Sequence, residues 1–173
     1  MPQPVLYIFG GGHVSIALAN AAHTAGFAIG IIDDRESFAN RERFPMAREI
    51  YTSFEESFGK IEPGAATYLV IVTRGHKDDM HVLRWAVGTS PRYIGMIGSK
   101  RKVLSVYRAL EKDGIAPEKF ASVHAPVGLD IGALTPEEIA ISITAELIAI
   151  RRGATNLSHK AVNHVSATPA SVV

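Results

Sequence analysis

The segment Val5–Ser15, with the sequence VLYIFGGGHVS, decides the fold. Five apolar residues, Val5–Phe9, predict a short buried strand that ends at three consecutive glycines, Gly10 to Gly12. Apolar residues then recur at helical spacing, and a glycine stands where a helix C-cap is expected (Val14, Ala17, Leu18, Ala21, Ala22, Ala25 and Gly26). A strand, a glycine turn and a helix in this order are typical of the first unit of a dinucleotide-binding sheet.

After this first unit, predicted strands and helices alternate along the chain. Further strands are expected at Ala28–Ile32, Arg48–Tyr51, Tyr68–Val72, Tyr93–Ile97 and Val123–His124. Helices are expected at His13–Ala25, Asp78–Val87 and Lys100–Lys112, with a short one near Ser37–Arg41. The alternation predicts an α/β fold, a Rossmann-like doubly wound parallel sheet of about six strands with helices on both faces.

The last helix has the clearest boundaries. Thr135-Pro136-Glu137-Glu138 combines a Thr N-cap, a proline at the first helical position and a glutamate at the third, which is a capping box. Arg151-Arg152-Gly153 supplies cations and a glycine stop at the other end. We therefore expect one Rossmann-like domain over residues 1–153 and a mobile C-terminal tail over 154–173.

Composition excludes several classes of protein. The chain has 173 residues and no cysteine, which rules out disulfides, thiolate zinc sites, iron–sulfur clusters and a Cys nucleophile. A formal net charge of +1 gives no general attraction to nucleic acid or membrane. No signal-peptide pattern and no apolar run long enough to cross a bilayer occurs, so we expect a soluble cytoplasmic protein.

The glycine turn predicts a nucleotide-type ligand. Gly10 permits the tight turn, and Gly12 lets a pyrophosphate approach the helix N-terminus, where free N–H groups favour anions. Ser15 replaces the third glycine of the motif. Asp33 follows Gly12 by 21 residues and is predicted to accept hydrogen bonds from a ribose hydroxyl. The alternatives are a glycine turn without a ligand and, for Arg35, either a solvated turn or stacking on an adenine.

Two more loops should open at the same edge, Thr73-Arg74-Gly75-His76 and Gly98-Ser99-Lys100-Arg101. Lys100, Arg101 and Lys102 occupy the first helical positions, where each cation opposes the helix dipole by about 0.3–1 kcal/mol. That arrangement favours an anionic partner, and a solvated basic face is the alternative. The acids and histidines near His76 match no metal-ligand spacing, so no metal site is predicted.

Six segments together resemble the C-terminal Rossmann domain of the XdhC/CoxI family. They are Phe9–Val14, Asp33–Arg35 with Glu42–Pro45, Val72–Lys77, Tyr93–Lys100, His124–Gly132 and Thr135–Glu138. The resemblance covers about Val5 to Arg152. It implies a maturation factor for xanthine dehydrogenase-type molybdenum hydroxylases, which binds the molybdenum cofactor, helps its sulfuration and delivers it to the apoenzyme. Because family members usually carry a Cys-bearing N-terminal domain, we expect a separate Cys-bearing accessory subunit to work with this chain.

These observations lead to one set of predicted cofactor-binding residues: Gly10, Gly11, Gly12, His13, Val14, Asp33, Asp34, Thr73, Arg74, Gly75, His76, Gly98, Ser99, Lys100 and Arg101. The expected ligand is molybdenum cofactor (molybdopterin or its dinucleotide) or NAD(P), and the expected partner is an apo molybdenum hydroxylase. No catalytic residue is predicted. An NAD-dependent oxidoreductase and a pure protein-interaction module stay open as alternatives, and an exposed sheet edge makes a homodimer plausible.

Overall fold

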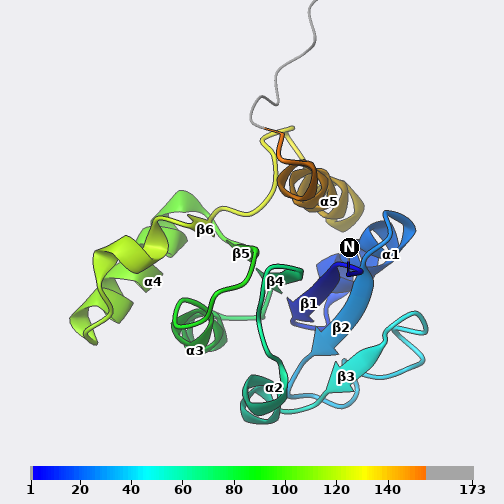
Figure 1. Cartoon of the computed structure of the whole chain (residues 1–173). Coiled ribbons are helices and arrows are strands. Elements are labelled where there is room, and N and C mark those ends of the chain that lie inside the picture. The colour runs from blue at the N-terminus through cyan, green and yellow to red at the C-terminus, as the bar shows by residue number, and fades with distance from the viewer. Residues whose placement is uncertain (1, 155–173) are drawn as a thin grey trace, which may run out of the picture.

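The computed structural model describes residues 2–154, so the predicted tail lies, apart from Ala154, outside the described residues. Six strands form one parallel sheet in the order β3-β2-β1-β4-β5-β6 (Figure 1). The strands are β1 (Val5–Phe9), β2 (Ala28–Ile32), β3 (Glu49–Tyr51), β4 (Thr67–Ile71), β5 (Tyr93–Met96) and β6 (Val123–His124). This order is that of a doubly wound dinucleotide-binding sheet, with its switch point between β1 and β4.

Helices cover both faces of the sheet, which confirms the predicted fold class. The helices are α1 (His13–Thr24), α2 (Phe54–Lys60), α3 (His76–Ala86), α4 (Lys100–Lys112) and α5 (Pro136–Arg152), with a 3-10 turn, η1 (Pro117–Phe120). One core cluster joins α1 and α5 to alternate strand residues such as Ile8 and Tyr68. A second joins α2, α3 and α4 to the intervening residues such as Phe9 and Leu69. No helix of residues 2–154 is long and apolar enough to cross a membrane.

The structure differs from the sequence-based boundaries in a few places. The segment predicted as a short helix near Ser37–Arg41 consists of turns. There the amides of Phe38 and Ala39 both donate to the carbonyl of Arg35, and Asn40 bonds the backbone through its side chain. Such local side-chain bonds compete with helix formation. The short elements α2 and η1 were not predicted, because neither is long enough to show a helical period.

Candidate functional site

The three glycines after β1 play different roles. Gly10 has φ +121°, and a Cβ there would collide with the carbonyl oxygen of Val72 at the end of β4. A Cβ on Gly11 would lie 2.6 Å from the carbonyl oxygen of Phe38. A Cβ on Gly12 would meet nothing within 4 Å. Gly10 and Gly11 are therefore required by packing against the protein itself, whereas Gly12 leaves open space at the start of α1.

Two helices beside the switch point begin without a side-chain cap. Gly12 is the N-cap of α1 and Gly75 is the N-cap of α3, and space is open over both. The first cap-to-helix bonds run from Ile16 N to Gly12 O and from Asp79 N to Gly75 O, each 3.1 Å long. The backbone N–H groups that precede Ile16 in α1 and Asp79 in α3 therefore have no carbonyl partner within their own helix. The predicted residues His13, Val14 and His76 lie in these two first turns.

The carboxylate of Asp33 joins the loops after β1 and β2. It accepts hydrogen bonds from Gly11 N (2.8 Å) and from the backbone, Nε and Nη2 of Arg35 (3.0, 2.9 and 2.8 Å), and the residue is only 3% exposed. Burial alone would raise the pKa of Asp33, but these donors outweigh burial and hold the pKa below 3.8. A ribose contact at Asp33 stays a prediction, and it would require one of these donors to move.

Sequence reasoning missed the support for the glycine turn. The guanidinium of Arg35 lies over the ring of Phe38 at 3.6 Å, so in this structure it stacks on a protein side chain. Arg43 lies near the same ring at 5.0 Å and donates through Nη2 to the carbonyl of Gly11 (2.8 Å). The segment after β2 therefore fixes the turn after β1. In the sequence, the segments Asp33–Arg35 and Glu42–Pro45, which carry part of the family resemblance, marked this region.

The loop after β4 is tied to both of its neighbours. Arg74 is exposed and lies 3.8 Å from Asp34 and 3.9 Å from Asp78. The Thr73 hydroxyl donates to Asp79, a carboxylate that is fully buried and also pairs with Lys102 of α4. The structure thus brings the loops after β1, β2, β4 and β5 together at one edge, as the sequence predicted for parallel strands.

The cationic start of α4 is only partly compensated. Lys102 is neutralised by Asp79, and the Ser99 hydroxyl caps the helix by accepting from Lys102 N (3.2 Å). Lys100 and Arg101 are exposed, and no carboxylate of residues 2–154 lies within ion-pair distance of them. Two cations, Lys100 and Arg101, therefore oppose the dipole of α4 without a counter-charge within residues 2–154.

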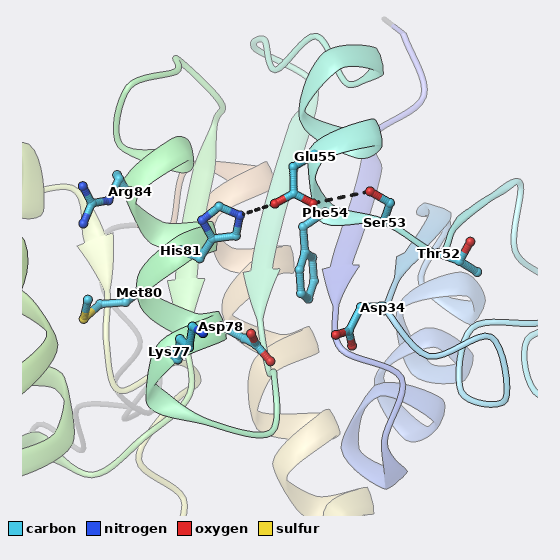
Figure 2. Close-up of a pocket in the computed structure, with 10 residues that line it drawn as sticks. All are labelled: Asp34, Thr52, Ser53, Phe54, Glu55, Lys77, Asp78, Met80, His81 and Arg84. Carbon is cyan, nitrogen blue, oxygen red and sulfur yellow. Dashed lines mark hydrogen bonds and ion pairs between the residues drawn. The ribbon is translucent and has the colours of Figure 1, made fainter.

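Two cavities are lined by residues from the loops and helices that follow the strands. The first, of about 700 Å³, is bordered by Asp34 after β2, by the residues after β3 and by α2 and α3 (Figure 2). Between α2 and α3 this cavity is bordered by a hydrogen bond between His81 Nε2 and Glu55 Oε1 (2.9 Å). The second, of about 640 Å³, lies between Gly98–Lys100, the loop 126–133 and the start of α5. Each cavity has room for a ring system.

A buried polar cluster holds the loop of the second cavity. Glu146 of α5 accepts hydrogen bonds from the Tyr93 hydroxyl and from Gly128 N (3.4 Å), and His124 Nδ1 lies 3.6 Å away. Burial first, and then the charge of Glu146, raise the pKa of Tyr93 well above 10. The Glu146 carboxylate thus joins the backbone of the loop after β6 to α5.

The comparisons with known proteins identify the domain. A family model for the XdhC Rossmann domain matches residues 6–147. The chain belongs to this family. Within residues 2–154 of this XdhC Rossmann domain, no group of three or more His, Asp or Glu side chains is arranged to hold a metal.

Known relatives of this XdhC Rossmann domain are longer proteins. It is 35% identical over 156 residues to the uncharacterized protein YqeB of Escherichia coli, covering 88% of the chain and 28% of that protein. It is 32% identical over 152 residues to a probable xanthine dehydrogenase subunit of Bacillus subtilis, covering 87% and 44%. A crystal structure described as a xanthine dehydrogenase from Bacillus halodurans superposes with a TM-score of 0.78 at 32% identity, covering 88% and 45%. The chain thus spans less than half of each relative.

Proposed function

We propose that this XdhC Rossmann domain is an accessory factor that holds an anionic cofactor and assists its delivery to a xanthine dehydrogenase-type apoenzyme. The cofactor is a nucleotide-type or molybdopterin compound, bound as cargo at the carboxyl edge of the sheet. The names of two relatives refer to xanthine dehydrogenase, which supports the choice of partner. The chemistry of the edge supports the choice of cargo.

One observation carries the proposal: α1 and α3 both begin at an uncapped glycine with open space over it, on the two sides of the switch point. A serine at either position would cap its helix and stabilise it by a few tenths of a kcal/mol relative to glycine. Glycine at both positions leaves the amides for a ligand. Amide donors and the positive end of the helix dipole favour a phosphate or pyrophosphate.

The remaining features suit the rest of such a cargo. Lys100 and Arg101 add two exposed positive charges beside the second cavity, where they can meet a phosphate. The two cavities have room for a pterin in one and a nucleoside in the other. Because the chain has no cysteine, it supplies no thiolate to molybdenum or sulfur. That chemistry would come from a Cys-bearing accessory subunit.

The first experiment adds the missing caps. Calorimetric titration of the purified chain with molybdopterin, CTP, NAD and pyrophosphate measures affinity, and thermal unfolding measures stability. Replacement of both Gly12 and Gly75 by serine should weaken the bound anion at least tenfold while leaving the melting temperature equal or higher. The control is Gly59→Ser in α2, where space is also open. Unchanged affinity in the double variant would overturn the proposed anion site.

The second experiment tests the cations. A Lys100→Gln/Arg101→Gln variant should bind the same ligands several-fold more weakly, with a smaller dependence on salt. Arg108→Gln/Lys112→Gln removes two charges from the other end of α4 and should leave the affinity unchanged. Hydride transfer from NADH to a carbonyl compound would instead support an oxidoreductase and overturn the accessory role.

Delivery requires its own assay. The cofactor-loaded chain is mixed with an apo molybdenum hydroxylase, and enzyme activity is followed against the same amount of free cofactor. We expect faster reconstitution from the loaded chain, and slower reconstitution when the Gly12/Gly75 double variant replaces it. Equal rates for loaded chain and free cofactor would restrict the function to storage.

A further inference from the structure

A separate cavity lies at the opposite, amino edge of the sheet. It has a volume of about 500 Å³. Its apolar walls come from the segments that precede β1 and β4, including Pro4, Ala65 and Ala66. Three arginines border it, Arg92 before β5 and Arg151 and Arg152 at the end of α5. None of these residues belongs to the candidate site described above.

The arginines have few protein partners. Arg92 donates through Nη2 to Ile150 O (3.1 Å), and Arg151 donates through Nη1 to Ala25 O (2.9 Å). The Nε of Arg151 is buried and has no hydrogen-bond partner among the described residues. No carboxylate of residues 2–154 forms an ion pair with any of the three. Three arginines thus border one cavity, and none of them has a counter-charge within residues 2–154.

A tyrosine adds a further unused donor. Tyr68 borders the cavity although it is only 1% exposed, and its hydroxyl takes part in none of the hydrogen bonds of the described residues. Phe27 fixes its ring edge-on with centroids 5.1 Å apart, and the guanidinium of Arg151 lies 4.7 Å from the centroid of the same Phe27 ring. Tyr68 and Arg151 are therefore both held in place by packing against Phe27.

Stabilisation of α5 explains only part of this arrangement. Cations near a helix C-terminus interact favourably with the dipole, and the bond from Arg92 to Ile150 O serves that purpose. However, a guanidinium has five N–H donors, and Arg92 and Arg151 each use one in these bonds. A buried unpartnered Nε costs free energy unless something accepts from it. An anion in the cavity would satisfy it.

We propose that this cavity is a second binding site, for a small organic anion that carries a carboxylate or phosphate on an apolar body. Arginine matches both anions because its planar fork can donate two parallel hydrogen bonds. The proline and alanine walls supply apolar contact that a bare inorganic anion cannot use. The site is independent of the proposed function, since it lies at the other edge of the sheet.

The experiment uses phenyl phosphate and benzoate as probes, with inorganic phosphate and benzyl alcohol for comparison. Calorimetry gives affinities, and amide NMR spectra of the ¹⁵N-labelled chain locate the binding. Both organic anions should bind at least tenfold more tightly than inorganic phosphate or benzyl alcohol, and should shift the amides of Ala65, Ala66 and Arg152. Shifts confined to the glycine turn, or equal affinity for inorganic phosphate, would overturn the proposal.

Variants keep the test specific. Arg92→Gln/Arg152→Gln should weaken phenyl phosphate at least tenfold, whereas Arg48→Gln/Arg108→Gln, which removes two charges elsewhere, should not. Tyr68→Phe keeps the packing and removes only the hydroxyl, so it should weaken binding several-fold without lowering the melting temperature. If the affinity of both the double-arginine and Tyr68 variants equals that of the unaltered chain, no anion site exists there.

Discussion

Gly10 and Gly12 stand two residues apart, yet the fold requires a glycine at only one of them. An alanine at Gly10 would need a positive φ of +121° and would place its Cβ against the carbonyl of Val72. Gly10→Ala should therefore cost about 3 kcal/mol or more in unfolding free energy, measured by urea denaturation. The comparison is Gly64→Ala, where a Cβ meets nothing within 4 Å. A loss below about 1 kcal/mol at Gly10 would contradict the geometry.

Asp33 predicts a pH dependence of stability. Its pKa is lower in the folded chain than the ordinary 3.8, so the unfolded chain binds the proton more tightly. The carboxylate therefore contributes stability that is fully present above about pH 3.8 and is lost as the pH falls through the folded pKa. Asp33→Asn should lower unfolding free energy at pH 7 by about 2 kcal/mol and flatten its decline below pH 4. An unchanged acid limb in denaturant titrations would exclude this contribution.

The sequence predicted the residues of the glycine turn better than their partners. The three glycines and Asp33 follow from a local pattern of strand, turn, helix and acid. The donors on Asp33 and the bond from Arg43 to Gly11 depend on contacts between segments up to 32 residues apart. Local sequence patterns do not reveal contacts between distant segments. For this reason the sequence predicted a ribose contact for Asp33, and solvent or an adenine for Arg35.

At the scale of elements, α3 and α4 are joined by a buried ion pair. Asp79 is fully buried and accepts from Lys102 and from the Thr73 hydroxyl. Lys102→Met alone should cost about 3–5 kcal/mol in unfolding free energy, because it leaves the carboxylate buried without its counter-charge. The double variant Asp79→Asn/Lys102→Met should recover much of that loss. Additive losses in this double-mutant cycle would mean that the two side chains act independently.

Element boundaries were predictable where local chemistry sets them. The capping box at Thr135 and Glu138 and the left-handed Gly153 begin and end α5 as the sequence indicated. Asp78 and Asp79 both lie in the first turn of α3, but only Asp79 is buried. Its partner stands 23 residues along the chain, on a helix whose rotation is set by its own apolar face. The prediction of a helix near Ser37–Arg41 was wrong for a different reason, since the Asn40 side chain bonds the local backbone and competes with helix formation.

On the scale of the whole molecule, parallel strands separate two kinds of binding site. Every strand ends at the edge with the glycine turn and begins at the edge with the arginines, so the two proposed ligands approach from opposite sides. Alternation of strands and helices was enough to predict the fold class, but the order of strands and the arginine cavity were not predictable. Arg92 bonds a carbonyl of α5 that stands 58 residues further along the chain, and only the fold brings it to Arg151 and Arg152.

This separation predicts additive stabilisation by two ligands. A ligand that binds only the folded chain raises unfolding free energy by about 2.7 kcal/mol at a hundredfold excess over its dissociation constant. Pyrophosphate at the carboxyl edge and phenyl phosphate at the amino edge, each at that excess, should together give the sum of their separate effects in urea denaturation. The Gly12→Ser/Gly75→Ser variant should lose only the pyrophosphate contribution, and Arg92→Gln/Arg152→Gln only that of phenyl phosphate. If the second ligand adds nothing once the first is saturating, both compete for one site, and the assignment of two separate edges is wrong.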